Sequence, residues 1–154
     1  MANIFSYKEK TMQKLKPILL AEDNANDIEL TLAVFREHNL ANHIDVVCNG
    51  AEAIDYLLYR GAYANRPKEK PAVILLDIKM PKISGIEALK EIKQNPKLKD
   101  ISVVMLTSSN LETDIVESYN LGVNAYVVKP VDFSEFVKAI KTIGFFWSLL
   151  NKTP

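Results

Sequence analysis

A run of five apolar residues at positions 72–76, followed directly by Asp77, constrains this chain more than any other feature. The run is too short to span a membrane, and its valine, isoleucine and leucine residues are typical of a strand buried on both faces of a parallel sheet. Because an unpaired carboxylate is costly inside such a strand, we place Asp77 at its carboxyl end. Ligand sites in open α/β sheets form at that edge. Asp77 is therefore the residue around which we expect a site.

The composition of the chain limits the class of protein. Its 154 residues are 48% hydrophobic and 25% charged, which suits one domain with a full core. A formal net charge of zero argues against a nucleic-acid partner. No apolar run is long enough for a membrane and no signal-type segment precedes the domain, so we expect a cytoplasmic protein without a membrane partner. Cys48, the single cysteine, is expected to be a small buried hydrophobic residue, and His38 and His43 are expected at the surface.

Short apolar strands alternate with helical patterns five times. The strands are predicted at residues 18–21, 44–48, 72–77, 101–106 and 125–128. This alternation predicts an α/β fold, a doubly wound parallel sheet with helices on both faces. We expect residues 1–16 to form an N-terminal arm, residues 17–150 a single domain with an extended last helix, and residues 151–154 a tail. No stretch is left for an output domain.

Helix starts can be predicted from capping residues. Asn24 or Asn26 is expected to cap the first helix. The capping-box spacing occurs twice, in Ser84–Glu87 and in Ser109–Glu112, so a helix is expected to begin at each serine.

Polar residues follow four of the predicted strands at their carboxyl ends: Glu22 and Asp23, Asp77, Thr107, and Lys129. The carboxyl ends of parallel strands lie at the same edge, so these side chains are expected to meet although they are far apart in the sequence. Clustered carboxylates repel one another, and a hard divalent cation relieves that repulsion. Oxygen ligands favour Mg²⁺. We therefore predict a magnesium site at this edge.

Such a cluster suggests phosphoryl chemistry. A carboxylate held beside Mg²⁺ can act as a nucleophile toward phosphorus and form an acyl phosphate. The metal and a lysine would neutralise the oxygens of the transferred group. The Thr107 hydroxyl could then bond the new phosphoryl group, and a bond made only in the modified state can bias the position of the following loop.

The ordered set of residues resembles the receiver domain of two-component response regulators over about residues 17–143. It includes Met80 and Pro81 after Asp77, and Pro130 after Lys129. The resemblance implies a flavodoxin-like (βα)5 fold with strand order 2-1-3-4-5. It also implies that a sensor histidine kinase is the phosphoryl donor.

The resemblance assigns roles to individual residues. Asp77 is the expected phospho-acceptor, Thr107 the switch hydroxyl, Lys129 the lysine that pairs with the phosphoryl group, and Tyr126 the aromatic residue whose rotamer follows the switch. The expected ligands of Mg²⁺ are Asp23 and Asp77 directly, Glu22 directly or through water, and the backbone carbonyl of Lys79. Glu22 replaces the commoner aspartate of the family. Two positions that tune dephosphorylation in the family are occupied here by Lys79 and Ser109.

The chain also resembles a narrower group, the stand-alone regulators that are paired with phytochrome-type kinases. The similarity lies in Arg60-Gly61 and Pro67, in the long polar connection before the third strand, and in the extended last helix. Members of this group tend to form homodimers through the fourth helix, fifth strand and fifth helix. The apolar residues near the end of the chain, Phe145, Phe146, Trp147, Leu149 and Leu150, either close over the domain or form a partner face. We favour a dimer or partner face that contains Tyr126, Phe145, Phe146 and Trp147.

Three other functions fit the sequence less well than the signalling role. A phosphatase of the haloacid-dehalogenase type has a second aspartate two residues after its nucleophile, where this chain has Lys79. A flavodoxin-like cofactor carrier needs a phosphate loop after the first strand, where Glu22 and Asp23 would repel phosphate. A degenerate receiver that serves as a scaffold would not need Asp77, Thr107 and Lys129. We therefore expect no separate enzyme activity, only a phospho-acceptor that takes part in its own phosphoryl transfer and dephosphorylation.

Overall fold

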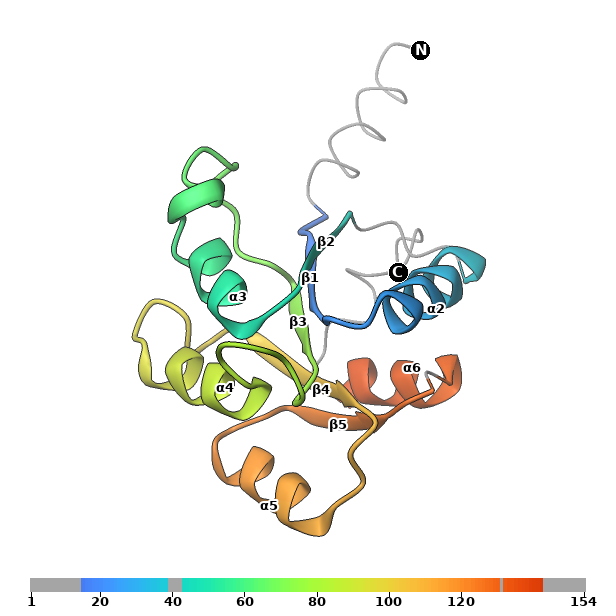
Figure 1. The fold of residues 1–154 in the computed structure, drawn as a ribbon. Helices are drawn as coiled ribbons and strands as arrows, with labels where there is room; N and C mark the ends of the chain where they lie inside the picture. Colours follow the sequence, from blue (N-terminus) through green and yellow to red (C-terminus); the bar gives the residue numbers. More distant parts are fainter. Residues whose placement is uncertain (1–14, 39–42, 131, 143–154) are drawn as a thin grey trace, which may run out of the picture.

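A computed structural model describes residues 15–38, 43–130 and 132–142 of the chain. Five strands form one sheet (Figure 1): β1 Ile18–Ala21, β2 Ile44–Val47, β3 Val73–Leu76, β4 Ser102–Thr107 and β5 Ala125–Val128. All neighbouring strands are parallel, and the order is β2-β1-β3-β4-β5. The predicted fold class and strand order are confirmed.

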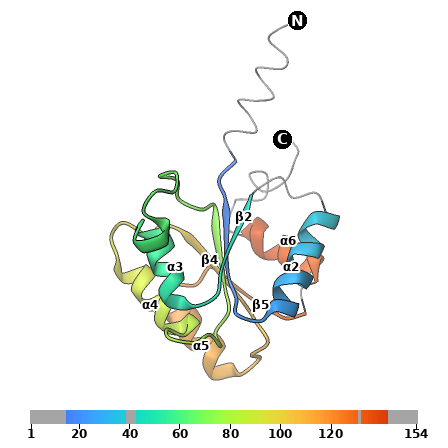
Figure 2. The same ribbon diagram turned by 45° about the horizontal axis from the view of Figure 1, so that its top comes forward.

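Helices cover both faces of the sheet. They are α2 Ala25–Glu37, α3 Gly50–Leu57, the 3₁₀-helix η1 Gly61–Tyr63, α4 Gly85–Gln94, α5 Glu112–Asn120 and α6 Phe133–Thr142. Figure 2 shows α2 and α6 on one side of the strands, with α3, α4 and α5 on the other. Each of the first four strands is followed by a helix that leads to the next strand, and β5 is followed by α6, as the alternating pattern predicted.

The core has two parts, one on each face of the sheet. Residues of β3 alternate between them, so that Ile74 and Leu76 pack toward α3 and α4, while Val73 and Leu75 pack toward α2 and α6. All four are fully buried, which explains why β3 has no polar position. The ring centroids of Phe35 and Phe136 lie 4.7 Å apart in the second part, where they join α2 to α6.

Two of the predicted helix caps are confirmed and one is wrong. Asn24 accepts a hydrogen bond from the backbone of the first turn of α2, and Ser84 does the same for α4. Helix α5 begins only at Glu112, after Leu111, which makes no capping bond through its side chain. The Ser109 hydroxyl donates to the Asp114 carboxylate at 2.5 Å, and its oxygen accepts from the backbone N–H of Leu111 at 3.4 Å, so the backbone N–H that it bonds belongs to the residue before α5 and not to the first turn of the helix.

The prediction for Cys48 is also wrong, because the residue is exposed. It follows β2, which is the edge strand of the sheet and is only partly buried along most of its length. The chain turns there into α3, and the backbone N–H of Cys48 donates to the Glu52 carboxylate at 3.0 Å. A position at the end of an edge strand thus lacks the second layer that would cover its side chain.

Several predictions fall outside the described residues. These are the arm up to residue 14, the end of the last helix with Phe145, Phe146 and Trp147, and the tail. The boundaries of the domain at residues 17 and 150 stay predictions. Within the described parts of the chain, no helix is both long enough and apolar enough to cross a membrane.

Candidate functional site

Backbone hydrogen bonds extend the sheet beyond its strands at the carboxyl edge. In each case the backbone N–H of the residue after a strand donates to a backbone carbonyl of the neighbouring strand. The bonds are Glu22 to Val47 at 2.9 Å, Asp77 to Ala21 at 3.1 Å, and Lys129 to Thr107 at 2.8 Å. The residues that follow the strands are therefore held by the sheet rather than by loose loops. This gives their side chains fixed starting points at one edge.

Three carboxylates meet at that edge. Glu22, Asp23 and Asp77 each place one oxygen within 4.8 Å of the others. Glu22 and Asp77 are buried, whereas Asp23 is exposed. One oxygen of Glu22 accepts hydrogen bonds from the backbone N–H groups of Asp23 at 3.1 Å and Asn24 at 3.3 Å. Burial, together with the neighbouring Asp77, raises the pKa of Glu22 to about 7.

Lys129 lies among these acids. Its Nζ donates to Glu22 Oε1, to Asp27 Oδ2 at 2.7 Å and to Asp77 Oδ2 at 3.3 Å. Burial alone would disfavour its charge, but the hydrogen bonds to Asp27 and Glu22 outweigh that effect and raise the pKa of Lys129. The site therefore holds a permanent cation beside the predicted acceptor.

One oxygen of Asp77 is left without a partner. Oδ1 is buried and makes no hydrogen bond to any described residue. A buried carboxylate oxygen in this state is costly, and such groups mark places where an ion or ligand completes the site. Glu22, Asp23 and Asp77 each offer one oxygen, and these oxygens form the hard donor set that Mg²⁺ prefers, so the residues present fit that ion. The carbonyl of Lys79 stays a prediction as a further ligand.

The two predicted switch residues are linked through Ser109. Thr107 ends β4 and is fully buried, and its hydroxyl oxygen accepts a hydrogen bond from the backbone N–H of Ser109 at 3.3 Å. The Tyr126 hydroxyl donates to the backbone carbonyl of Ser109 at 2.7 Å. Because the Ser109 side chain also binds Asp114, one residue joins β4, β5 and α5. A change at Thr107 can therefore be transmitted to Tyr126 and to the start of α5.

The loop after Asp77 depends on a glycine that the sequence reasoning did not identify. The backbone N–H of Gly85 donates to Ile78 at 2.8 Å. A Cβ atom at Gly85 would lie 1.9 Å from the backbone oxygen of Asp77, well inside van der Waals contact. Only glycine lets α4 begin so close to the predicted acceptor. Its place directly after the capping Ser84 was a possible signal, because a small residue there permits close approach of the backbone.

Asp27 is a second residue that the sequence reasoning missed. It lies in the first turn of α2 and not at the end of a strand, so the argument from strand ends passed over it. The available signal was its place three residues after the capping Asn24, which puts an acid in the first turn of the helix, close to the strand-end acids.

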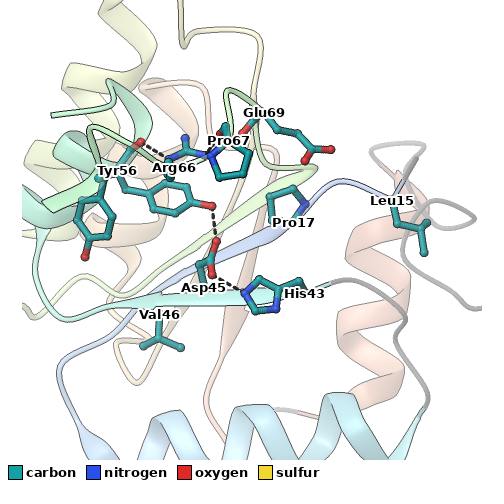
Figure 3. Close-up of a pocket in the computed structure, with 10 residues that line it drawn as sticks. Leu15, Pro17, His43, Asp45, Val46, Tyr56, Arg66, Pro67 and Glu69 are labelled. Carbon is teal, nitrogen blue, oxygen red and sulfur yellow. Dashed lines mark hydrogen bonds and ion pairs between the residues drawn. The ribbon is translucent and has the colours of Figure 1, made fainter. Parts of the chain in front are cut away.

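A cavity of about 440 Å³ lies at the opposite, amino edge of the sheet (Figure 3). Its lining includes His43, Asp45, Tyr56 and Arg66. The Tyr56 hydroxyl donates to Asp45 at 2.6 Å, and His43 Nε2 lies 2.7 Å from the other oxygen of Asp45. His43 is exposed, as predicted.

Arg66 closes this cavity from the long polar connection between α3 and β3. It donates to three backbone carbonyls, those of Tyr56 at 2.8 Å and of Pro67 and Glu69 at 3.1 Å each. Its guanidinium carbon lies 3.7 Å from the centre of the Tyr56 ring and 4.2 Å from that of Tyr59. Lys68 Nζ also lies 5.0 Å from the centre of the Tyr59 ring, so the connection is held by cations stacked on aromatic neighbours, with Arg66 making the shorter contacts.

Comparisons with known proteins identify the family and agree with the fold. Residues 18–141 match the family described as the response regulator receiver domain. Response regulator Rcp1 of Synechocystis sp. (strain ATCC 27184 / PCC 6803 / Kazusa) is 40% identical over 86% of this chain and 88% of its own length. An Mn²⁺-bound crystal structure of Rcp1 has a TM-score of 0.72 to this chain at 40% identity, covering 90% of this chain and 97% of the other.

Two further solved structures are similar. The bacteriophytochrome response regulator AtBRR has a TM-score of 0.83 at 55% identity and covers 90% of this chain and 99% of its own. The phosphorylated cyanobacterial phytochrome response regulator RcpA has a TM-score of 0.71 at 42% identity, covering 86% of this chain and 93% of its own.

The chain belongs to the response regulator receiver domain family. It is the receiver domain of a two-component response regulator, and its similar relatives include regulators described as those of phytochromes. This agrees with the expectation from the residues at the carboxyl edge. The family is one of signalling domains and not of enzymes with separate substrates.

Proposed function

We propose that Asp77 is the residue that accepts the phosphoryl group from a sensor histidine kinase. The observation that carries this assignment is the unpartnered, buried Oδ1 of Asp77, which lies on a carboxylate already in contact with the Lys129 ammonium. Both are held at the carboxyl edge by backbone bonds of the sheet. An acceptor needs such an oxygen, because it must be free to form a new bond.

The transfer itself requires little covalent chemistry from the protein. A carboxylate oxygen of Asp77 attacks phosphorus, the bond from phosphorus to the donor's imidazole nitrogen breaks, and that nitrogen keeps the electron pair. Lys129 places a positive charge where the phosphoryl oxygens gather. Glu22, Asp23 and Asp77 would hold Mg²⁺, with the Lys79 carbonyl as a further ligand, and the ion would supply additional positive charge to those oxygens. Dephosphorylation by water would use the same groups.

The phosphorylated state would be read through Thr107 and Tyr126. A hydrogen bond from the Thr107 hydroxyl to a phosphoryl oxygen would exist only after transfer, so it would favour one position of the loop that contains Ser109. Tyr126 is held by the carbonyl of Ser109, and movement of that residue would alter the Tyr126 contact.

We infer that the phosphoryl donor is a phytochrome-type kinase. We also infer that two copies of the chain associate through α5, β5 and α6, which are the fourth helix, fifth strand and fifth helix expected from the sequence. The kinase class is supported by the names of the similar relatives. The dimer face is supported by its exposed apolar side chains: Leu111 is 60% exposed, Val116 50%, Tyr119 49% and Val128 41%. Location in the cytoplasm stays a prediction.

The dimer can be tested by sedimentation with and without beryllium fluoride, a phosphoryl mimic. Val116→Glu should weaken association. Leu30→Glu is the matched control, because Leu30 is as exposed as Leu111 but lies on α2, on the other side of the sheet. Equal association of Val116→Glu and Leu30→Glu would reject this face.

The acceptor is tested by mass measurement. Wild type and Asp77→Asn are incubated with Mg²⁺ and a small phosphodonor, such as acetyl phosphate, or with a kinase. We expect one hydrolysable phosphoryl adduct on wild type only, because the amide of asparagine cannot attack phosphorus as a carboxylate does. Asp45→Asn, at the amino edge, is the control and should still accept one phosphoryl group. An adduct on Asp77→Asn, or none on wild type with any donor, rejects the assignment.

A further inference from the structure

The Lys129 ammonium has a partner that lies outside the cluster of predicted metal ligands. Asp27 reaches it from the first turn of α2, with its Oδ2 2.7 Å from Nζ, a shorter contact than the 3.3 Å between Nζ and Asp77. The two residues are 102 positions apart. The contact therefore depends on the tertiary fold, which brings α2 against the residues that follow β5.

The ammonium has no hydrogen left for another acceptor. A lysine ammonium has three N–H donors. Each of them is matched here by one carboxylate, from Glu22, Asp27 or Asp77. A phosphoryl group on Asp77 would add about 1.5 to 2 negative charges and three strong acceptor oxygens. Lys129 can bond those oxygens only if it releases one of its present partners.

The burial of the three partners decides which of them can be released. The Glu22 side chain is 2% exposed, so its oxygen would be left buried without a hydrogen-bond partner from water if Lys129 released it. Asp77 itself carries the phosphoryl group. The Asp27 side chain is 34% exposed, so water can solvate its carboxylate. It also lies in the first turn of a helix, where the positive end of the helix dipole favours an anion.

We propose that Asp27 is a positioning residue that holds the Lys129 ammonium in the unphosphorylated protein and releases it when Asp77 carries a phosphoryl group. The proposal rests on the acceptor role of Asp77 argued above. In this exchange, Lys129 leaves the Asp27 carboxylate and bonds to a phosphoryl oxygen. The free-energy cost of breaking the bond between Asp27 and Lys129 then disfavours the phosphorylated state. Removing the charge of Asp27 should therefore favour that state.

Binding of beryllium fluoride in saturating Mg²⁺, measured by calorimetry, tests the exchange. We expect Asp27→Asn to bind the mimic about fivefold more tightly than wild type, the effect of one partly exposed ion pair. Glu29→Gln is the matched control, because it removes the same charge from an exposed position on the same helix, and it should stay within about twofold of wild type. Asp27→Glu keeps the charge and should also stay close to wild type.

A second measurement reports on Lys129 without metal or phosphoryl mimic. In EDTA, the ¹⁵N resonance of the Lys129 ammonium should shift and its hydrogens should exchange faster with water in Asp27→Asn, and neither change should occur in Glu29→Gln. This measurement reports on the bond between Asp27 and Lys129 directly. Circular dichroism and thermal unfolding of both variants would show separately whether either substitution lowers the stability of the fold.

The outcomes are distinct. Unchanged or weaker binding of the mimic by Asp27→Asn, or the same tightening in Asp27→Glu, overturns the proposal. An unchanged Lys129 ammonium signal in Asp27→Asn also overturns it. If wild type binds no beryllium fluoride at all, the acceptor role of Asp77 fails and this inference fails with it.

Discussion

Arg66 at the amino edge of the sheet and Lys129 at the carboxyl edge are two cations whose charges are paired in different ways. At the amino edge, Arg66 donates to three backbone carbonyls and lies against the rings of Tyr56 and Tyr59. At the carboxyl edge, Lys129 donates to three carboxylates, one of which, Asp77, keeps a buried oxygen without a partner among the described residues.

The difference concerns what each edge can still bind. Arg66 Nη2 also has no hydrogen-bond partner among the described residues, but the guanidinium plane is covered by aromatic faces, and a cation in that setting is already stabilised. A carboxylate oxygen in a cluster of like charge has no such compensation. The arrangement around Arg66 stabilises a loop, whereas the arrangement around Asp77 favours a further cation.

The largest expected difference between the edges lies in their glycines. Gly85→Ala would place a Cβ 1.9 Å from the Asp77 carbonyl, so α4 or the strand end must move, and we expect a loss of about 3 kcal/mol in the free energy of unfolding. Gly61→Ala, on the amino side, has a φ of +55° but its nearest neighbouring atom is 3.9 Å away, so we expect a loss of about 1 kcal/mol from backbone strain alone.

Urea unfolding of the two glycine variants measures this difference. If Gly85→Ala lowers the free energy of unfolding no more than Gly61→Ala does, the loop after Asp77 has more room than the structure shows. Phosphorylation of Gly85→Ala under conditions where it stays folded adds a second comparison. Phosphorylation of Asp77 should be impaired in Gly85→Ala and unaffected in Gly61→Ala.

The next largest effect concerns the two cations. Lys129→Ala removes a charged donor from the phosphoryl group, and we expect binding of beryllium fluoride to weaken by about 10- to 100-fold. Binding of Mg²⁺ should change much less and should not weaken, because the ammonium repels the metal. Arg66→Ala should lower the free energy of unfolding while leaving binding of the mimic unchanged at temperatures where it is folded.

Calorimetry with Mg²⁺ alone and then with the mimic separates these effects. Equal losses of metal and mimic binding in Lys129→Ala would contradict the role of this lysine. A loss of mimic binding in folded Arg66→Ala would show that the two edges are coupled, and the comparison between them would then fail.

The sequence predicted the carboxyl edge well because parallel strands place their ends together. Asp77 and Lys129 could be assigned from that rule and from the apolar runs before them, and the structure brings them into contact. Asp27 could not, since its contact with Lys129 depends on how the residues after β5 turn toward α2. Ser109 had the spacing of a capping box, but its hydroxyl bonds to Asp114 instead of capping the helix.

The amino edge was less predictable because its order also depends on contacts between side chains that are set by the tertiary fold. The polar connection of residues 62–70 has no apolar period that would indicate a fixed structure. Its order comes from the stacking of Arg66 on two tyrosines of the preceding segment, a contact between side chains that no local pattern reveals. Cys48 was wrongly placed in the core because the pattern of β2 does not show that it is the edge strand.

The pH dependence of stability is a further expected property of the carboxyl edge. In EDTA, Glu22 binds its proton up to a pH of about 7 in the folded protein, because burial raises its pKa from the ordinary value of 4.5. Between pH 4.5 and pH 7, Glu22 keeps its proton in the folded state and has lost it in the unfolded state. The free energy of unfolding should therefore fall as the pH rises through this range. Relative to Glu22→Gln, which cannot titrate, we expect wild type to lose about 2 kcal/mol between pH 4.5 and 7.

Chemical unfolding of both proteins across this range measures the difference, with Glu29→Gln as the control for an exposed acid. A difference between wild type and Glu22→Gln that stays flat or grows with pH would contradict the raised pKa. Addition of Mg²⁺ sharpens the result, because the ion requires the ionised carboxylate and competes with the proton. The stabilisation of wild type by Mg²⁺ should therefore be larger at pH 8 than at pH 6, and this rise should be reduced in Glu22→Gln. At the amino edge, His43→Gln should leave the stabilisation by Mg²⁺ unchanged at both pH values, because this side chain lies at the opposite end of the strands.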